Sequence, residues 1–454
     1  MLHEVTMVGR DKKVPSEGPR DIFQVERPVK KLQPRGAVAA IWLRSPLSAG
    51  PAIAVALGAV AIFVVLSVTV GGPNAADSNV STYFAWTVSH AHFACAYVNP
   101  RNQGGTAAPL YPLISSGFAA VLRIGHGVPF PNSAVLGRHC ASAIPAIYKW
   151  SVTSKALTTT LWIGYVGWLV LAFGVLRLIR TVSRRPRRGE AITLLLVSWA
   201  PPVMMCLVDF FHPQDLLAFG LVLLSLSFVT RQRWMVAGLL LGLAVLAQQF
   251  AWLAVVALVI VTKKTARSQL VAGLAISIGV VAAPLLWLTS GRAWESIVYG
   301  TGGSSWSQSL LVQTGLRGNS LYLVARLTPL LMTAITASWM RSRYRDEILR
   351  PVPLISLIAV SMLWRLVFEI NVWGYYFMAV TVMLLVLAAV SGRLRLGIVA
   401  WVIVVSLASA DAEMVQRPWY DPIPMWVWQG IMLIWAFALV INALRATPAG
   451  ESTR

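Results

Sequence analysis

Long apolar runs recur through most of this chain, from Pro51 to Leu444, and several approach the length of a membrane crossing. A transmembrane helix needs about 20 apolar residues, because the hydrocarbon core of a bilayer is about 30 Å thick. Of the 454 residues 57% are hydrophobic and only 12% are charged, whereas soluble domains have about 25% charged residues. The sequence therefore predicts an all-α polytopic membrane protein.

The apolar runs predict about 12 transmembrane helices, with ends uncertain by a few residues. The first lies at 51–70. The others lie near 157–179, 190–208, 214–230, 234–247, 249–262, 268–289, 320–340, 351–367, 372–390, 395–410 and 425–444. The runs between 216 and 262 are short, so we expect two of these segments to be tilted or re-entrant.

Three regions follow from this map. Residues 1–48 are polar and form a predicted cytoplasmic tail, residues 49–445 form the transmembrane domain, and residues 446–454 form a second cytoplasmic tail. A long outer loop, 71–155, follows the first span. Within it, the apolar segment 110–124 is expected to lie along the membrane surface.

The basic residues gather in short loops that this map places on one side of the membrane. These loops are Arg180–Arg188, Arg231–Arg233, Lys263–Arg267, Arg341–Arg350 and Arg393–Arg395. Cytoplasmic loops carry an excess of Lys and Arg, so we predict a multi-pass plasma-membrane protein with both termini cytoplasmic. The net charge of +21 then reflects topology and contact with membrane lipids, and no nucleic-acid partner is expected.

The topology map places most of the histidines and many of the acidic residues on the outer side of the membrane. Ionisable groups near the membrane tend to mark function, so any chemistry is expected to be extracytoplasmic. Asp77 follows the first span by about seven residues. Its carboxylate can act as a general base toward a hydroxyl group. Alternatively, Asp77 begins a helix as an N-cap ahead of Val80 and Tyr83.

A second polar group is the predicted outer turn from Asp209 to Asp215, which includes His212 and Gln214. Two aspartates and a histidine resemble metal ligands, but so tight a turn seldom presents all three to one ion, and we predict no metal. The alternative is structural, with a helix break at Pro213 and Asp215 capping the next helix. At another outer turn, Gln248 and Gln249 need partners for their amides, either a polar ligand or the neighbouring turn.

The third group is the segment Trp364–Tyr376, which contains Arg365, Glu369 and Tyr375. Arg365 and Glu369 are four residues apart on one helix face and can form an ion pair. The other interpretation makes Arg365 a phosphate clamp, because a guanidinium binds phosphate oxygens in a bidentate manner.

The three cysteines are too few for a disulfide framework or a zinc site. Cys95 and Cys140 share the outer loop and are predicted to pair in an oxidising compartment, whereas Cys206 is predicted to be a buried apolar thiol. The chain has no Walker motif, no HExxH and no GxSxG, and we predict no cofactor.

Several stretches together resemble one family. They are D-x5-Y-F-A-W from Asp77, C-A-Y, P-L-Y-P-L, H-P-Q-D-L-L-A-F-G-L-V-L-L-S-L from His212, and G-L-L-L-G-L-A-V-L-A-Q-Q-F before Ala251. They are similar to the GT-C integral-membrane glycosyltransferases that use polyprenyl-phosphate sugars, most of all to the actinobacterial mannosyltransferases of phosphatidylinositol mannoside and lipomannan assembly. The resemblance covers about 51–262 by pattern. Many members carry Lys-Pro where this chain has Gln248 and Gln249.

The resemblance implies a GT-C-like fold and the transfer of a sugar, such as mannose or arabinose, from a polyprenyl-phosphate donor. The acceptor would be a lipid-linked or cell-wall glycan on the outer face. Asp77 would be the catalytic base. The expected substrate-binding residues are Tyr83, His212, Gln214, Asp215, Gln248, Gln249, Arg365, Glu369 and Tyr375. The rival functions are a transporter or flippase, and a non-catalytic protein that only binds polyprenyl lipid.

Overall fold

The structure is a computed structural model. It describes residue 88, residues 108–124, 154–182, 186–207, 211–289, 311, 314–370 and 374–391, and residues 430, 434, 437 and 441. The chain divides into two units, Met1–Ser48 and Ala49–Arg454. All the described residues belong to the second unit, so the predicted tails and their boundaries stay predictions.

Every regular element in these ranges is a helix. The α-helices are α5 (Leu110–Ile124), α7 (Ser154–Val182), α8 (Pro186–Ser198), α9 (Pro201–Leu207), α10 (Pro213–Val229), α11 (Trp234–Ala247), α12 (Ala251–Val261), α13 (Lys264–Leu288), α15 (Gly318–Tyr344), α16 (Pro351–Phe368) and α17 (Met378–Val390). Two short 3-10 helices are η3 (Arg345–Leu349) and η4 (Gly374–Phe377).

Four helices of the described part are long and apolar enough to cross a membrane. These segments are Gly164–Val182, Lys264–Leu288, Ser320–Tyr344 and Pro351–Phe368. A fifth crossing results if α8 and α9, which meet at a bend of 55°, form one broken span. The protein is therefore an all-helical membrane protein in its described part, as the apolar runs predict.

The predicted spans from 157–179 to 372–390 each coincide with a helix or a helix pair, within a few residues. Those at 51–70 and 395–410 lie outside the described residues, and only isolated residues of 425–444 are described. The total of about 12 spans therefore stays a prediction. The apolar segment 110–124 is helix α5, and Tyr111 near its start is buried in the core.

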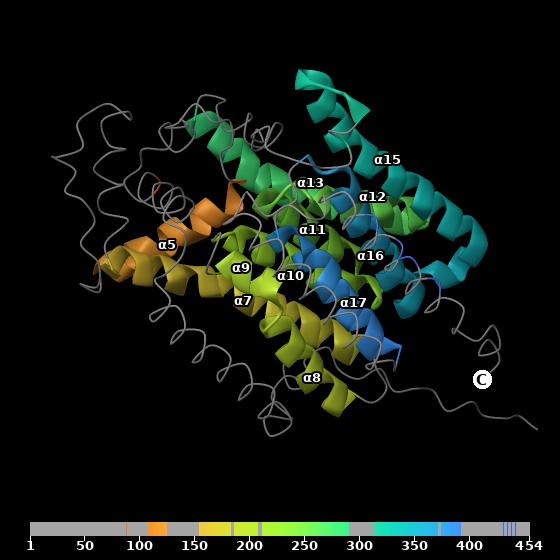
Figure 1. Ribbon diagram of the computed structural model, residues 1–454, viewed down its shortest axis with the longest axis horizontal. Helices are drawn as coiled ribbons and strands as arrows, with labels where there is room; N and C mark the ends of the chain where they lie inside the picture. Colours follow the sequence, from red (N-terminus) through yellow and green to blue (C-terminus); the bar gives the residue numbers. More distant parts are fainter. Residues whose placement is uncertain are drawn as a thin grey trace, which may run out of the picture. The chain divides into compact units, whose positions relative to one another are not determined.

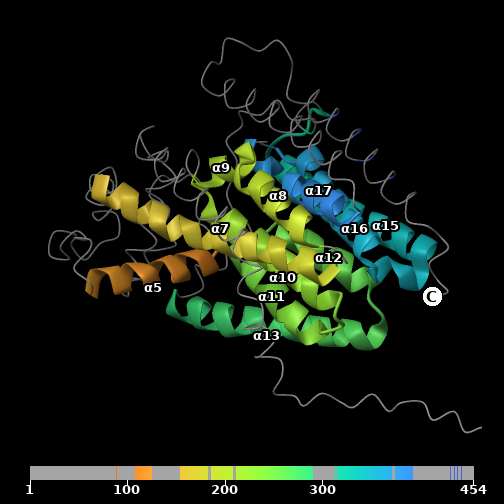
Figure 2. The same ribbon diagram turned by 90° about the horizontal axis from the view of Figure 1, so that it is seen from below.

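Helix α10 is the centre of the described bundle. All its residues except Phe228 are buried, and a helix that is apolar all round is typical of a core position. It packs against α7 on one side and α11 on the other, and α11 in turn packs against α13. Figures 1 and 2 show α10 between α7 and α11 in both views. A second group, α15, α16 and α17, joins this layer through α12.

Small residues allow α7 and α10 to approach closely. A Cβ added to Gly174 would lie 2.6 Å from the carbonyl oxygen of Gly220, and one added to Gly220 would lie 2.6 Å from the amide nitrogen of Leu171. Close contact of backbones at small residues is a main source of helix association in membranes, where lipid removes the hydrophobic driving force. The glycines of α7 and α10 therefore fix the position of the central helix.

Two helices present apolar side chains outward. On α15 these are Leu323, Leu327, Leu331, Ile335 and Trp339, and on α13 they are Val271, Ile276, Val280, Trp287 and Leu288. Large exposed apolar faces are rare on soluble proteins. The outer faces of α13 and α15 therefore suit contact with lipid.

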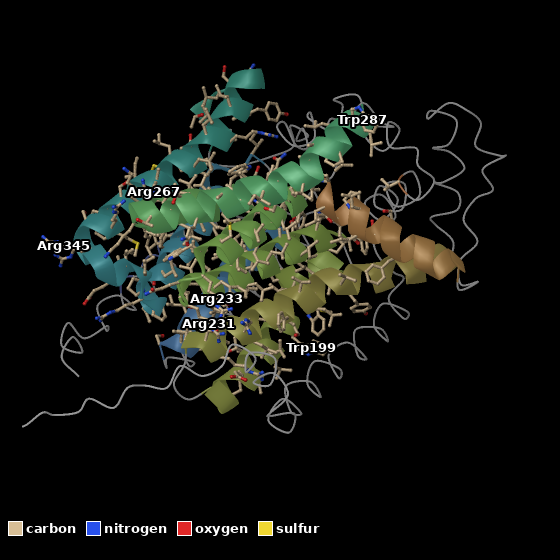
Figure 3. The ribbon with its side chains drawn as sticks, turned by 180° about the vertical axis from the view of Figure 1, so that it is seen from behind. Trp199, Arg231, Arg233, Arg267, Trp287 and Arg345 are labelled. Atoms are coloured by element: carbon tan, nitrogen blue, oxygen red, sulfur yellow. The ribbon has the colours of Figure 1, made fainter. Side chains whose placement is uncertain are left out.

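Cationic residues gather at one end of the helices, which we call the basic end. It comprises the end of α7, the turns α10–α11 and α12–α13, and the end of α15. Figure 3 shows Arg231, Arg233, Arg267 and Arg345 toward this end, and Trp287 toward the other end of α13. The Arg177 guanidinium lies 5.2 Å from the ring centroid of Phe228, and Nη1 of Arg341 donates to the Ile260 carbonyl at 2.5 Å. The side of the membrane that the basic end faces stays a prediction.

We predict that Gly220→Ala destabilises the protein, because its new methyl group would overlap the backbone of α7. Overpacking of this kind costs about 1–3 kcal/mol, and the apparent Tm of the purified protein in detergent should fall. The matched control is Gly279→Ala in α13, where an added Cβ meets nothing within 4 Å. Alanine favours a helix more than glycine does, so this control should keep or raise the Tm. Equal losses in both variants would contradict the role of the close approach.

Candidate functional site

A cluster of polar and aromatic side chains lies at the end of the bundle opposite the basic end. Three structural elements supply most of it: the start of α10, the turn between α11 and α12, and the end of α16 with the following η4. We call it the polar cluster. Its residues are His212, Gln214, Asp215, Gln248, Phe250, Arg365, Glu369, Tyr375 and Tyr376.

The start of α10 is held by a compact turn. Pro213 occupies the first turn of the helix, where its missing N–H costs nothing. Phe211 adopts a φ of 51° and is buried, and the His212 amide donates to the Cys206 carbonyl at 2.6 Å. Helix α7 lies against this turn, because a Cβ on Gly167 would be 2.3 Å from the Pro213 carbonyl oxygen. The turn therefore presents the first residues of α10 in one fixed orientation.

Asp215 is 2% exposed, and its carboxylate accepts a hydrogen bond from the Gln248 amide. The oxygen of that same amide accepts from the Gln249 backbone N–H at 3.1 Å. The alternative in which Asp215 caps α10 is wrong: the N-cap residue is His212, and no side-chain capping bond forms. Of the two alternatives for the Gln248 amide, the neighbouring turn supplies the partner.

His212 stacks on Tyr375 of η4, with ring centroids 4.3 Å apart and an interplanar angle of 14°. Its Nδ1 lies 2.9 Å from the Nε2 atom of Gln214. An amide that donates to Nδ1 requires the neutral tautomer with its proton on Nε2. The Gln214 carbonyl oxygen is buried, and it has no hydrogen-bond partner within the described part of the chain. This oxygen is a ready acceptor for a hydroxyl group.

Arg365 is enclosed by two aromatic rings. Its guanidinium carbon lies 4.6 Å from the ring centroid of Phe250 and 4.5 Å from that of Tyr376. A desolvated cation over an aromatic face gains about 2 kcal/mol. The charge of Asp215 also acts on Arg365. The two rings therefore hold a cation at the centre of the polar cluster.

Arg365 also forms the predicted ion pair with Glu369. Its Nε lies 3.5 Å from Oε2, and the two side chains are 15% and 30% exposed. Burial raises the pKa of Glu369, against the lowering effect of the Arg365 charge. Among the described residues no hydrogen bond engages the two terminal nitrogens of Arg365. Since those nitrogens carry four of the five donors of a guanidinium, Arg365 can still bind an anion.

The sequence interpretation missed three members or neighbours of this cluster. Phe250 and Tyr376, the rings beside Arg365, were not predicted as site residues: Phe250 ends an apolar run, and Tyr376 ends the segment Trp364–Tyr376 without a role of its own. Arg326 of α15 lies close enough to Glu369 to act on its charge. The last could have been found, because an ionisable residue inside an apolar span is costly and tends to mark function.

Other predicted residues lie outside the described part. These are Asp77, Tyr83 and Asp209, together with Cys95 and Cys140. Cys206 is a free, buried thiol, as predicted. No group of three histidine, cysteine or acidic residues in the described ranges is placed to hold a metal ion. Gln249 lies in the turn that carries Gln248, and its backbone N–H donates to the side-chain oxygen of Gln248.

We expect Asp215→Ala to destabilise the protein more than Asp215→Asn. Alanine leaves the half-buried Gln248 amide without its acceptor, which costs up to about 1–3 kcal/mol. Asparagine keeps an acceptor oxygen and loses only the charge near the start of a helix, worth about 0.3–1 kcal/mol. The measurement is the apparent Tm of both variants in detergent. A Tm for Asp215→Asn as low as that for Asp215→Ala would show that charge, and not the hydrogen bond, stabilises the turn.

A double-mutant cycle measures the ion pair. Arg365→Leu leaves a partly buried carboxylate without its cation and should cost about 1–3 kcal/mol, less than for a fully buried pair. Glu369→Gln removes that carboxylate, so the double variant should lose at least about 1 kcal/mol less than the sum of the single losses. Additive losses would mean that the rings, and not Glu369, hold Arg365.

Comparison of the chain with protein families, with curated proteins and with solved structures found no match. What the polar cluster can do is therefore inferred from its own chemistry. It combines a guanidinium with uncommitted donors, a buried amide oxygen without a partner in the described part, and a stacked pair of rings. Such a combination can hold an anionic group beside groups that bear hydroxyls.

Proposed function

We propose that the protein is a GT-C-like glycosyltransferase that moves a sugar from a polyprenyl-phosphate donor to a lipid-linked or cell-wall glycan. The observation that carries this proposal is the polar cluster around Arg365, which combines groups that can bind a phosphate with groups that can bind hydroxyls. The sequence resemblance described above supplies the reaction class. The sugar, such as mannose or arabinose, is part of the same proposal.

The depth of the cluster supports a substrate carried by a lipid. Helix α12 has 11 residues, so it is about 16 Å long, against about 30 Å for the hydrocarbon core. Lys263 and Lys264 follow its far end, and lysines favour the membrane–water interface. Gln248 at the near end then lies within the depth of the hydrocarbon layer. A donor whose phosphate is attached to a polyprenyl chain can reach such a position laterally.

Arg365 is the proposed partner of the donor phosphate. A guanidinium suits bidentate contact with phosphate oxygens, and its Nη donors have no hydrogen-bond partner among the described residues. The rings of Phe250 and Tyr376 restrict the orientation of this side chain. Glu369 contacts only Nε, so the ion pair and the phosphate contact are compatible. Gln248 and Gln249, at the position where many family members carry Lys-Pro, bring no charge to this task.

The sugar would lie beside Gln214 and His212. The Gln214 oxygen, which has no partner among the described residues, can accept a bond from a sugar hydroxyl. His212, stacked on Tyr375, lies beside the Gln214 amide. In the proposed reaction an acceptor hydroxyl oxygen attacks the anomeric carbon. The bond from that carbon to the phosphate oxygen breaks, and polyprenyl phosphate leaves with the bonding electrons. Asp77, as proposed base, takes the proton of the attacking hydroxyl, and a single displacement inverts the anomeric centre.

Asp77→Asn should lower transfer by about 10²–10⁴-fold, the usual contribution of a general base, and should leave donor binding near normal. The assay supplies labelled polyprenyl-phosphate mannose or arabinose to the purified protein in lipid vesicles with an acceptor fraction, and analyses the products. Arg365→Leu should instead weaken binding of the donor. Combining it with Glu369→Gln should recover stability but not binding, which separates a phosphate contact from an ion pair.

The main rival is a protein that binds or moves polyprenyl lipid without chemistry. The recess of the polar cluster is compatible with it, because carriers also hold polar groups within the membrane. Asp77→Asn separates the two: a carrier would keep its function, whereas an enzyme would lose it. Normal transfer by Asp77→Asn together with lost transfer by Asp215→Asn would assign the base to the start of α10 instead.

A further inference from the structure

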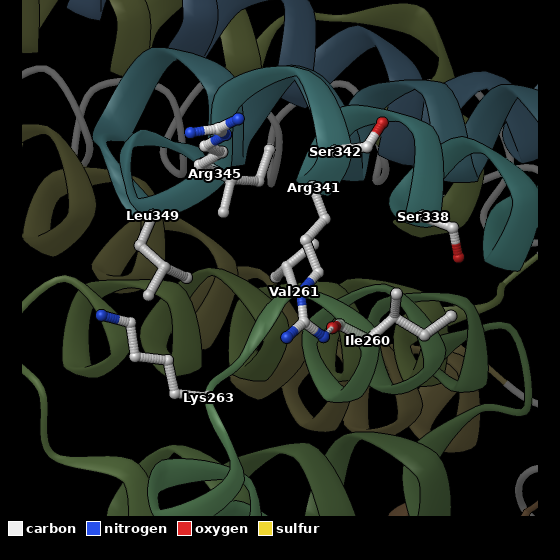
Figure 4. A pocket seen from close by; sticks show the side chains of 9 residues that line it. Ile260, Val261, Lys263, Ser338, Arg341, Ser342, Arg345 and Leu349 are labelled. Carbon is white, nitrogen blue, oxygen red and sulfur yellow. Dashed lines mark hydrogen bonds between the residues drawn. The ribbon is translucent and has the colours of Figure 1, made fainter. Parts of the chain in front are cut away.

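A cavity of about 450 Å³ lies at the basic end, far along α12 from the polar cluster. It opens between the end of α15, the short helix η3 and the turn from α12 to α13. Three cationic residues line it: Lys263 from the turn, and Arg341 and Arg345 from the end of α15. Figure 4 shows Arg341 extending from α15 toward Ile260 across this space, with Lys263 on the opposite wall.

The two arginines of the cavity, Arg341 and Arg345, keep hydrogen-bond donors that no described residue engages. Nη1 of Arg341 donates to the Ile260 carbonyl at 2.5 Å, which leaves four of the five guanidinium donors. Among the described residues neither Arg341 nor Arg345 has a carboxylate partner. The nearby Glu347 pairs with Arg350 at 3.1 Å. The cavity therefore has an excess of cations.

Helix ends alone do not account for this excess. The last carbonyls of α12 attract cations, because the C-terminus of a helix carries partial negative charge. Arg341 already donates a hydrogen bond to the Ile260 carbonyl, and Nη2 of Arg267 donates one to the Thr262 carbonyl at 3.0 Å. Arg345, at the end of α15 on the other wall, is not needed for either bond.

The interior of the cavity is apolar, and an apolar surface leads to it. Val261 and Ile348 in its lining are 3% and 1% exposed. Along α15, a ridge of outward side chains at four-residue spacing approaches the cavity. Its members and their exposures are Leu323 (59%), Leu327 (54%), Leu331 (59%), Ile335 (52%) and Trp339 (58%). The last of these lies just before Ser342 and Arg341, which line the opening.

We propose that this cavity binds the headgroup of an acidic phospholipid, with its acyl chains along the ridge of α15. Arg and Lys supply donors for the phosphate, Ser338 and Ser342 supply hydroxyls at the same opening, and the ridge supplies contact for hydrocarbon. Basic pockets between transmembrane helices bind acidic lipid headgroups in this way. The proposal does not depend on the proposed glycosyltransferase, because the cavity and the polar cluster lie at opposite ends of α12.

A soluble phosphate is the other source of the same chemistry. It would use the three cations but would gain nothing from the ridge. The ridge is the reason for choosing a lipid, since exposed leucine, isoleucine and tryptophan side chains follow α15 up to Trp339, the residue next to Ser338 of the lining.

The test uses the full-length protein in detergent with defined lipid, and native mass spectrometry to measure lipid retention. The double variant Lys263→Gln/Arg345→Gln removes two lining cations and keeps Arg341, whose bond to Ile260 is structural. Its matched control is Lys264→Gln/Arg343→Gln. These exposed residues neighbour the cavity cations in sequence and remove the same charge, but they do not line the cavity. Monodisperse elution of both variants establishes that they are folded.

The wild type should retain phosphatidylglycerol in preference to phosphatidylcholine of equal chain length. The cavity variant should lose at least about tenfold in apparent affinity for phosphatidylglycerol, since it loses charge-assisted hydrogen bonds that contribute to binding of the lipid phosphate. The control should change by less than about twofold. Equal losses in the two variants, or equal retention of the two lipids by the wild type, would overturn the proposal.

Two further measurements locate the lipid and identify its source. Phosphatidylglycerol with a photoreactive acyl chain should label the α15 peptide that contains Ile335 and Trp339, and the cavity variant should abolish that label. Labelling elsewhere only would overturn the proposed position. Millimolar inorganic phosphate or glycerol phosphate should fail to displace the lipid; full displacement would identify a soluble anion as the occupant instead.

Discussion

The hydrogen bond between Gln248 and Asp215 is the contact on which the polar cluster depends. It joins two turns at the ends of three short helices, within a bundle that is otherwise apolar. A buried amide or carboxylate without a partner costs several kcal/mol in such surroundings. Because each group satisfies the other, the turns next to α10, α11 and α12 can carry polar side chains within this apolar bundle. In the proposed function, these are the polar groups that a lipid-linked substrate would meet.

Arg365 is also a polar group held by its neighbours, but through aromatic rings and an ion pair instead of a hydrogen bond between amide and carboxylate. Two aromatic faces and one carboxylate contact at 3.5 Å hold the cation, and no carboxylate of the described ranges engages its terminal nitrogens. An arginine in a strong bidentate pair would have no donors left for a ligand. The arrangement thus combines a fixed position with binding capacity, which is what preorganised sites require. The basic end follows a related principle, since Arg341 anchors one helix to another while its charge still faces a cavity.

Much of the described fold could be predicted from apolar run length and from breaks at prolines and polar pairs. Helix α10 begins at Pro213, and the break between α11 and α12 falls at Gln248. The residues of the site were predicted as separate groups on outer turns. The neighbouring turn was one of two partners expected for the Gln248 amide, but nothing in the sequence singled out Asp215, 33 positions away, because hydropathy sets depth and not neighbours. The same holds for Phe250 and Tyr376, whose role depends only on where Arg365 lies.

The sequence by itself determined the helical membrane class, the boundaries of the described helices within a few residues, and the gathering of cations at one end of them. Local apolar length and loop charge decide these properties without reference to partners. Only the tertiary structure decided which helix is central and which side chains meet. Gly174 and Gly220 draw α7 and α10 into backbone contact. The packing of α9 against η4, and not any local preference, accompanies the stacking of His212 on Tyr375. Contacts between distant residues depend on the shape of the whole bundle, which no single segment contains.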